Sequence, residues 1–332
     1  MGFPSKALFA FNANIDYLKV VNEEDLAKIE AYSSDLSSKI SESFAWGVQK
    51  EIIVDVKACE FFLSSIKWEK TLIGGQAGNA AEQASSLGME CYLHSNFMNE
   101  KLLSLFSHKE RIFAANEKGF APATEFSSTV KNAHHFVLEN AETGTRFIAS
   151  YDPLPIHLED NFCHNISKEL PNISKAFLGG FHLIQTPLRL MKFVEEIKRW
   201  KEINPRLQIF VELGEFQNKE VMEKAKEELF PIVDMVGLND TELAAFGVEL
   251  EELGSHAKSL LYHTPDSHAV YPESELDEEA LLFAKKCASY KAKFGKCASE
   301  KELDDFEAEF VETPAHTVGL GDTFSCAYFM KS

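Results

Sequence analysis

From residue 175 onward, short apolar segments typical of buried strands alternate with longer segments that have helical spacing of apolar residues. The strand-like segments are "KAFLGGFHL" (175–183), "LQIFVEL" (207–213) and "VDMVGL" (233–238), and the helical ones span 188–200, 219–230 and 277–295. This alternation predicts an α/β fold whose mostly parallel, Rossmann-like sheet is covered by helices on both faces. Ligands of such sheets bind beyond the carboxyl ends of the strands, so polar residues at those ends are the first candidates for a site.

The first half of the chain has a different pattern. It predicts a buried first strand at 6–11, helical spacing over 22–44, a glycine turn that opens a small-residue helix at 73–88, and a strand at 90–95. The segments 134–140 and 144–151 flank "AETG" and predict an antiparallel hairpin. We therefore expect a large α/β domain from residues 1–16, 71–108 and 152–332, and a smaller β-rich lid from the insertions 17–70 and 109–151.

Composition restricts the partners of the chain. With 332 residues, 45% hydrophobic and 26% charged, it has the composition of an ordinary globular protein with an ample core. The formal net charge of −19 argues against nucleic acid or an anionic membrane surface as the main partner. We expect small-molecule partners, a monomer or small homo-oligomer, and a cytoplasmic location, because the sequence has no signal peptide and no run of 18 or more apolar residues.

The cysteines also favour a cytoplasmic protein. No C-x-x-C pair occurs among them, so the spacing of a zinc site is missing. We expect most of them to be buried, reduced thiols. They are Cys59, Cys91, Cys163, Cys287, Cys297 and Cys326.

Two polar or glycine-rich clusters stand in the first hundred residues. Asn14 and Asp16 follow the first strand, where an N-x-D pair is either a turn or cap, or two side chains that hydrogen-bond a polyol. Gly74, Gly75 and Gly78 open a helix, either for close packing or to admit a ligand. Their spacing does not match a dinucleotide fingerprint, and the sequence has no P-loop motif.

Two glutamates follow neighbouring strands of the predicted sheet. Glu212 ends one strand, and "NDTE" (Asn239 to Glu242) follows the next. Asn239 and Glu242 have the spacing of a helix-capping box, which is the structural reading. As a pair at adjacent strand ends, Glu212 and Glu242 could instead hold Mg²⁺, directly or through water, since that ion prefers oxygen ligands and bridges phosphates.

The C-terminal stretch "TVGLGDTFS" (317–325) predicts an anion site with a carboxylate beside it. Gly319 and Gly321 leave backbone N–H groups uncovered, and a helix that starts after them points its positive end into the same space. Asp322 is a poor anion ligand, so we predict that it accepts the proton of a substrate hydroxyl while the N–H groups of 319–322 stabilise a transferred phosphoryl group. The combination with a polyol clamp and a Mg²⁺ site predicts phosphoryl transfer to a hydroxyl.

Histidines give weaker signals. His263 follows a short strand and is either a loop residue or part of the site, and His134 and His135 lie in the hairpin, where we expect them on the lid surface.

The stretch "TVGLGDTFS" resembles the C-terminal signature of the ADP-dependent sugar kinases, a branch of the ribokinase-like superfamily whose ATP-dependent members usually have alanine where Leu320 stands. "FNANID" (11–16), "GGQAGNAAEQASSLG" (74–88), "LNDTE" (238–242) and "YHTPDSHAV" (262–270) are similar to that branch's sugar-binding N-x-D, glycine helix, N-x-x-E motif and nucleotide-side loop. These motifs occur in the expected order.

The resemblance implies a Rossmann-like domain with a β-rich lid and Mg²⁺-dependent transfer of the β-phosphoryl group of ADP to a sugar, which leaves AMP. It implies sugar contacts for Asn14, Asp16, Gly74 and Gly75, Mg²⁺ contacts for Glu212, Glu242 and Asp322, and nucleotide contacts for Asn239, His263, Val318, Gly319 and Gly321. Asp322 would be the general base beside the anion hole of Gly319 and Gly321, and Arg146 would contact phosphate.

Substrate choice within the family depends on one lid position. Its glucokinases carry a lid glutamate in a G-x-x-x-E-I context, and "GVQKEIIV" places Glu51 there, which favours glucose over fructose 6-phosphate. The chain departs from the family pattern at Phe210, where H-x-E becomes "FVE", and at Thr145, where asparagine is usual. An ATP-dependent kinase of another sugar or a nucleoside, and a non-catalytic sugar or nucleotide sensor, remain the alternatives.

Overall fold

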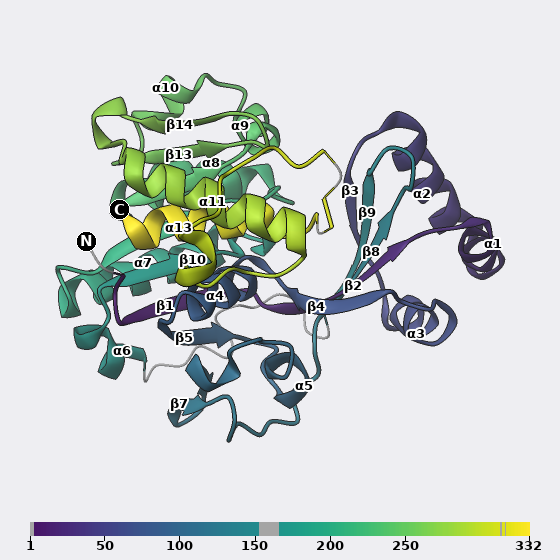
Figure 1. Cartoon of the computed structure of the whole chain (residues 1–332), viewed down its shortest axis with the longest axis horizontal. Helices are drawn as coiled ribbons and strands as arrows, with labels where there is room; N and C mark the ends of the chain where they lie inside the picture. Colours follow the sequence, from purple (N-terminus) through teal and green to yellow (C-terminus); the bar gives the residue numbers. More distant parts are fainter. Residues whose placement is uncertain (1–2, 153–165, 313, 316) are drawn as a thin grey trace.

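The computed structural model describes residues 3–152, 166–312, 314–315 and 317–332. These residues form two β-sheets of unequal size. Figure 1 shows the larger sheet inside a layer of helices and the smaller sheet, with α1, α2 and α3, projecting to one side as a lid. The predicted α/β ribokinase-like architecture, a mostly parallel sheet with a smaller second sheet, is confirmed.

The larger sheet has nine strands in the order β14-β13-β12-β11-β10-β1-β5-β6-β7. All neighbours are parallel except the two edge pairs, β13 with β14 and β6 with β7. The strands are β1 (Lys6–Phe11), β5 (Glu90–Ser95), β6 (Ile112–Asn116), β7 (Gly119–Pro122), β10 (Lys175–Leu178), β11 (Gln208–Glu212), β12 (Met235–Leu238), β13 (Leu260–His263) and β14 (His268–Tyr271). Because β1 lies between β10 and β5, the strand order reverses at β1, and a crevice opens beyond its carboxyl end.

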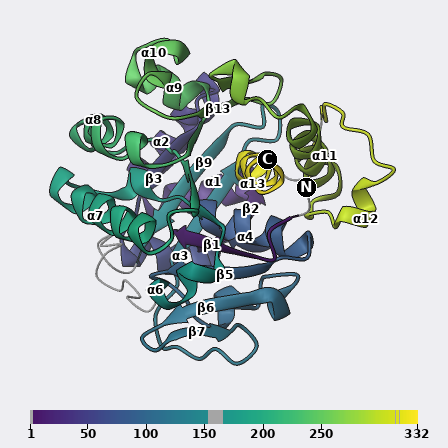
Figure 2. The same ribbon diagram turned by 90° about the vertical axis from the view of Figure 1, so that its left-hand side faces the viewer.

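Alternating side chains divide the core into two layers. Ala7 and Phe9 of β1 face one hydrophobic cluster, and Leu8 and Ala10 face the other. Figure 2 shows α4, α11 and α13 on one side of the sheet and α7 and α8 on the other. Both faces are therefore buried, which explains why the strands are apolar almost throughout.

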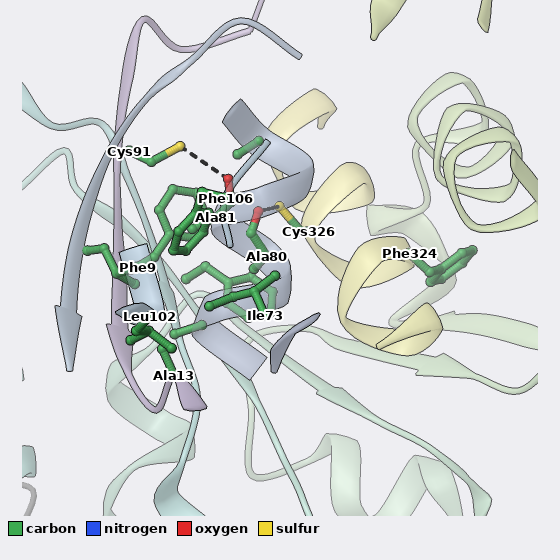
Figure 3. Packing of buried hydrophobic residues seen from close by; sticks show 14 of the residues in the cluster. Phe9, Ala13, Ile73, Ala80, Ala81, Cys91, Leu102, Phe106, Phe324 and Cys326 are labelled. Carbon is green, nitrogen blue, oxygen red and sulfur yellow. Dashed lines mark hydrogen bonds between the residues drawn. The ribbon is translucent and has the colours of Figure 1, made fainter. Parts of the chain in front are cut away.

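Small residues let two of the helices approach closely. Ala77, Ala80 and Ala84 of α4 are fully buried, and α4 packs against α13. In Figure 3 the Cys326 thiol of α13 points at α4, where it donates to the Ala80 carbonyl oxygen at 3.3 Å. The helices are α1 (Glu23–Tyr32), α2 (Ser34–Trp46), α3 (Val56–Ser65), α4 (Gln76–Ser86), α5 (Glu100–Leu103), α6 (Ile166–Glu169), α7 (Pro187–Ile203), α8 (Lys219–Glu228), α9 (Asp240–Phe246), α10 (Leu250–Gly254), α11 (Glu278–Phe294), α12 (Glu300–Leu303) and α13 (Leu320–Lys331).

The lid sheet has five strands in the order β3-β9-β8-β2-β4. They are β2 (Asn14–Val20), β3 (Lys50–Ile53), β4 (Lys70–Gly74), β8 (His134–Glu139) and β9 (Arg146–Tyr151). The predicted hairpin is the antiparallel pair β8 and β9. Their apolar positions, such as Phe136 and Phe147, are fully buried under the lid helices, in a hydrophobic cluster that continues into the α4 and α13 side of the large sheet.

The chain crosses between the two sheets within very few residues. Only residues 12–13 separate β1 of the large sheet from β2 of the lid, and only Gly75 separates β4 of the lid from α4. Gly75 has a φ of +76°, and a Cβ there would lie 2.7 Å from the Asn12 carbonyl oxygen. A side chain at Gly75 would therefore be excluded both by the backbone conformation and by the neighbouring crossing.

Three local expectations differ from the structure. The segment 14–20 forms strand β2, which the polar "NANID" conceals in the sequence. The helical region 22–44 is two helices, because Ser33 has an extended backbone and caps α2. Strands β6 and β7 belong to the large sheet, through pairing of β6 with β5, although we expected 109–151 in the lid.

Two further sequence observations can be compared with the fold. Cys59, Cys91, Cys287, Cys297 and Cys326 are buried, as predicted, while Cys163 lies outside the described residues. Across the described ranges, every helix is too short or too polar to span a bilayer.

Candidate active site

The first strand of the lid begins with a buried polar pair. Asn14 Nδ2 donates to Asp16 Oδ1 at 2.5 Å, and both side chains are 3% exposed. Gly74 lies beside them, since β2 and β4 pair Asn14 with Gly74, and a Cβ at Gly74 would overlap the Asp16 carboxylate. Burial raises the pKa of Asp16 to about 6. Asn14, Asp16, Gly74 and Gly75, four of the predicted sugar contacts, are thus brought together.

Strand register aligns Asp16 with other polar side chains on one face of the lid sheet. Asp16 is paired with His135, and His135 with Ser150. We predicted His135 on the lid surface, and this is wrong. Its side chain is 17% exposed, and Nε2 lies 3.9 Å from the Asp152 carboxylate. Although burial opposes the charged form, that carboxylate raises the pKa of His135 to about 9.

His134, the neighbour of His135, points to the opposite face of the strand. Its ring centroid lies 5.6 Å from that of Tyr17, and burial lowers its pKa to about 4. His134 is thus half-buried among the aromatic rings of Tyr17, Phe136 and Tyr151 and does not lie on the open surface of the lid as predicted.

Two adjoining cavities lie between this face and the large domain, and Asp152 and Leu183 line both. One is lined by Glu51, Ile53, Ser150, Asp152, Leu183, Gln185 and Gln217, and the other by Phe11, Asn12, Ala13, Asn14, Phe97, Ala133, His135, Asp152 and Leu183. Glu51, the predicted specificity residue, accepts a hydrogen bond from Ser150 Oγ in the first cavity. The carboxylate, amide and hydroxyl groups on these partly apolar walls are groups that can hydrogen-bond hydroxyl groups of a ligand.

The second cluster lies at the start of α13. Gly319 has a φ of +68° and is the N-cap of α13, so the predicted glycine turn followed by a helix is confirmed. Asp322 lies in the first helical turn, and Asn79 Nδ2 of α4 donates to Asp322 Oδ2 at 3.0 Å. Burial, followed by repulsion from Glu212, raises the pKa of Asp322 to about 7.

Helix α4 connects the two clusters. Gly75 precedes its first residue, and Asn79 follows Gly75 by four residues, so the two lie on the same face one turn apart. One turn rises about 5.4 Å. Two neighbouring turns of α4 therefore hold the two clusters. The Asn14–Asp16 pair lies beside Gly74, just before the first turn, and the Asp322 carboxylate lies beside Asn79, one turn later.

Glu212 has a histidine partner, although the H-x-E pattern is lost. Phe210 and Glu212 face the same side of β11, and Phe210 packs into the core against Phe177 and Phe329, at ring distances of 5.0 and 5.3 Å. The histidine comes instead from β13: His263 Nε2 lies 2.9 Å from Glu212 Oε1. Despite burial, this carboxylate raises the pKa of His263.

Glu242 is both a capping residue and a buried carboxylate. Asn239 N donates to Glu242 Oε2 at 2.9 Å, and Glu242 N donates to Asn239 Oδ1 at 3.0 Å, so the capping box exists. Burial, and then the charge of Glu212, raise the pKa of Glu242 to about 8. Asn239 therefore has a structural role, and its predicted nucleotide contact stays a prediction.

The carboxylates suit a Mg²⁺ ion that also binds phosphate. Glu212 Oε2 is buried with no hydrogen-bond partner among the described residues, and the charge of Glu212 helps to raise the pKa values of both Glu242 and Asp322. A cation would relieve this repulsion. Within the described ranges, no three His, Cys, Asp or Glu side chains converge in metal-binding geometry. The set therefore fits an ion held by one or two carboxylates, water and substrate phosphates rather than a closed protein cage.

Arg146 reaches from the lid to the loop before α13. Arg146 Nη1 donates to the Thr317 carbonyl oxygen at 2.9 Å, and Nη2 to Gln49 Oε1 at 2.8 Å. Thr317 directly precedes Val318 and Gly319, so the guanidinium lies beside the predicted anion site. Its predicted contact with phosphate stays a prediction, as does the nucleotide contact of Val318.

Sequence reasoning did not identify several residues of this site. No motif in the sequence singles out Asn79, Asp152 or Lys291, and the sequence predicts a surface position for His135. Asn79 stands inside the quoted glycine helix, so its helical spacing from Gly75 could have suggested it. Nothing in the sequence places Lys291, in the middle of an amphipathic helix, beside Asp322.

Comparison with known proteins agrees with this geometry. The conserved region of ADP-specific phosphofructokinases and glucokinases matches residues 5–275. The ADP-dependent glucose/glucosamine kinase of Pyrococcus furiosus is 23% identical, over 97% of this chain and 93% of its own length. The ADP-specific phosphofructokinase of Pyrococcus horikoshii is also 23% identical, over 71% of this chain and 63% of its own length.

Solved structures are similar at the level of the fold. An ADP-dependent kinase in complex with fructose 6-phosphate and ADPβS has a TM-score of 0.77 at 19% identity and covers 99% of this chain and 94% of its own. The adenosine kinase of Sinorhizobium meliloti has a TM-score of 0.62 at 16% identity and covers 100% of this chain and 89% of its own. The family's conserved region matches residues 5–275, which is most of the chain. We therefore conclude that this chain belongs to the ADP-specific phosphofructokinase and glucokinase family of phosphotransferases.

Proposed function

We propose that this protein transfers the β-phosphoryl group of Mg·ADP to a hydroxyl group of an unphosphorylated hexose, with glucose favoured over fructose 6-phosphate. The observation that carries the proposal is the carboxylate at the helix start. Asp322 stands in the first turn of α13, directly after the Gly319 turn, and the Asn14–Asp16 pair lies one turn away along α4. Three groups can therefore meet in one place: a sugar hydroxyl bound by Asn14 and Asp16, the Asp322 carboxylate, and the uncovered N–H groups at the start of α13.

In this proposal the side chains have separate roles. Asn14 and Asp16 orient the sugar through hydrogen bonds, and the backbone N–H groups of 319–322 stabilise negative charge on the transferred phosphoryl group. Asn79 occupies Asp322 Oδ2, so Oδ1 is the oxygen that accepts the hydroxyl proton. A base with a pKa of about 7 is matched to this task at neutral pH. Mg²⁺, held by Glu212 and Glu242, would neutralise phosphate charge.

The choice of an unphosphorylated sugar rests on the charges around the two cavities. The described residues that line them include Glu51 and Asp152 but neither lysine nor arginine, and the one cationic side chain, His135, already faces Asp152. A sugar phosphate brings about two negative charges at neutral pH. Two carboxylates without a free cation would repel it. The glucose/glucosamine kinases of Pyrococcus furiosus and Pyrococcus abyssi, which match almost the whole chain, give the same preference.

AMP release by the purified protein tests this function. We expect AMP from Mg·ADP with glucose, little with fructose 6-phosphate, and none without sugar. AMP with fructose 6-phosphate alone would reject the sugar preference, and turnover with ATP but not ADP would reject the donor. Sugar and nucleotide binding without turnover under all these conditions would favour the non-catalytic sensor.

The metal role of Glu242 can be examined separately. In Glu242→Gln the side-chain oxygen can still accept the capping hydrogen bond from Asn239 N, but the negative charge beside Glu212 is lost. We expect the Mg²⁺ concentration for half-maximal activity to rise about tenfold or more, because a carboxylate binds this hard ion better than an amide. Glu302→Gln, at the capping box of α12, is the matched control and should leave the Mg²⁺ titration unchanged. An unchanged titration for Glu242→Gln would remove it from the metal site.

A further inference from the structure

Lys291 of α11 is a buried lysine whose ammonium group ends between three helices. The residue is 4% exposed, and Nζ donates to Asn79 Oδ1, to the Gly319 carbonyl oxygen and to Thr323 Oγ1, each at 3.1 Å. Figure 1 shows α11 lying along α13, which in turn packs on α4. An ammonium group has three N–H donors, so these oxygens satisfy all of them.

All three acceptors of this lysine are uncharged. No ion pair of Lys291 is recorded among the described residues, whereas most buried lysines are paired with a carboxylate. A methionine of similar length would fill the same space between the helices without the cost of burying a charge. The positive charge therefore needs a reason other than packing.

The first reason is the orientation of Asn79. An ammonium group donates only, so the atom of the Asn79 amide that faces Lys291 must be the oxygen. The NH₂ group of the same amide then has to face Asp322, where it donates to Oδ2 at 3.0 Å. An ionised Asp322 accepts only and favours the same orientation, but a protonated Asp322 can also donate to the amide oxygen. Without Lys291 the amide could therefore reverse once Asp322 has taken up a proton.

The second reason is the conformation of the glycine turn. Lys291 Nζ and Thr323 Oγ1 both donate to the Gly319 carbonyl oxygen, at 3.1 and 2.8 Å. Gly319 is the residue with a φ of +68°, and a Cβ there would overlap the Asn79 amide. The lysine thus fixes the direction of the peptide group that follows Gly319, and the N–H groups that follow it are those of the anion site.

We propose that Lys291 is a positioning residue for phosphoryl transfer, which holds the Asn79 amide and the Gly319 turn in the arrangement that Asp322 and the anion site require. This inference rests on the proposed function of Asp322. It predicts an effect on kcat rather than on the KM of the sugar, because the sugar contacts Asn14 and Asp16 are not among the groups that Lys291 touches.

Three variants test the inference. Lys291→Met should lower kcat by about 10- to 100-fold with an unchanged sugar KM, which is the size expected for a residue that acts through another. Asn79→Asp keeps an acceptor for Lys291 but cannot donate to Asp322, so it should fold and still lose activity by at least the same factor. Lys175→Met is the matched control: Lys175 is a second buried lysine that binds α13, through the Phe329 and Ser332 carbonyl oxygens at the opposite end. It should lower Tm and leave kcat unchanged.

The kinetic constants and Tm of each variant decide the question. Wild-type kcat in folded Lys291→Met, or an equal loss in Lys175→Met, would overturn the positioning role. If Lys291→Met does not fold, Asn79→Asp decides, and wild-type kcat in that variant would overturn the inference. A wild-type protein that forms no AMP with any sugar would overturn both the proposed function and this inference, whereas an active wild type with unaffected variants would overturn the inference alone.

Discussion

Replacing Asp322 with asparagine is expected to lower kcat by about 10³- to 10⁴-fold, the range of a lost general base, while ADP and sugar still bind. Asparagine has nearly the same shape and can keep the contact with Asn79, but it cannot accept a proton from the sugar hydroxyl. AMP formation and isothermal titration with each substrate provide the two measurements. Asp305→Asn, on an exposed turn, is the control and should behave as the wild type. Retained turnover in Asp322→Asn would remove Asp322 from the role of base.

The same carboxylates predict a pH profile. Asp322 and Asp16 have pKa values of about 7 and about 6, and in the proposed roles both would act in the ionised form. Activity should therefore fall as the pH decreases: kcat/KM for the sugar should lose about tenfold per pH unit between 7 and 6, and about a hundredfold per unit below 6. The profile should be measured at saturating Mg²⁺, which keeps Glu242 ionised. A profile that is flat from pH 5 to 8 would contradict both assignments.

Replacing Asp16 with asparagine is expected to lower kcat/KM for the sugar by about 10²- to 10³-fold and to leave the Kd of ADP unchanged. Asp16 is almost completely buried, so in the proposed complex its carboxylate would form strong, charge-assisted hydrogen bonds with sugar hydroxyl groups, and the amide would lose the charge and one acceptor oxygen. Sugar saturation curves and ADP titration separate the two effects.

A matched lid aspartate controls for the loss of charge in that experiment. Asp35 lies on α2, and its side chain is 77% exposed, so Asp35→Asn should leave both constants unchanged. If Asp16→Asn weakened ADP binding as much as sugar binding, the variant would have disturbed the fold of the lid, and the sugar contact would not be supported.

Much of the large domain could be predicted from the sequence because its signals are local. Strands β10, β11 and β12 are apolar runs next to amphipathic helices, and the glycine turn before α13 is written in the sequence as "GLGD". Each signal depends on the propensity and periodicity of a few neighbouring residues. For the same reason the capping box of Asn239 and Glu242 and the buried pair of Asn14 and Asp16 could be located in advance.

The rest depends on contacts that no local pattern reveals. His135 looks like a surface histidine, and only the register of β2, β8 and β9 brings it next to Asp16 and Ser150. His263 could not be matched to Glu212 before β12 was known to lie between β11 and β13. Lys291 lies 212 residues from Asn79 along the chain, and its position in an amphipathic helix gives no indication of that contact.

The two short crossings between the sheets, at residues 12–13 and at Gly75, define an axis about which the lid could turn. For a rigid lid that turns about residues 12–13 and Gly75, side chains near this axis are displaced least, and those at the far edge are displaced most. Asn14 and Asp16 lie next to the axis, whereas Glu51 is on β3, at the opposite edge of the five-stranded sheet. In such a motion, and with the sugar bound as proposed, Asn14 and Asp16 would keep their contacts with the sugar over a wide range of lid angles, whereas the distance from Glu51 to the sugar would depend strongly on the angle. Binding of the sugar and discrimination between sugars would then belong to different parts of the lid sheet.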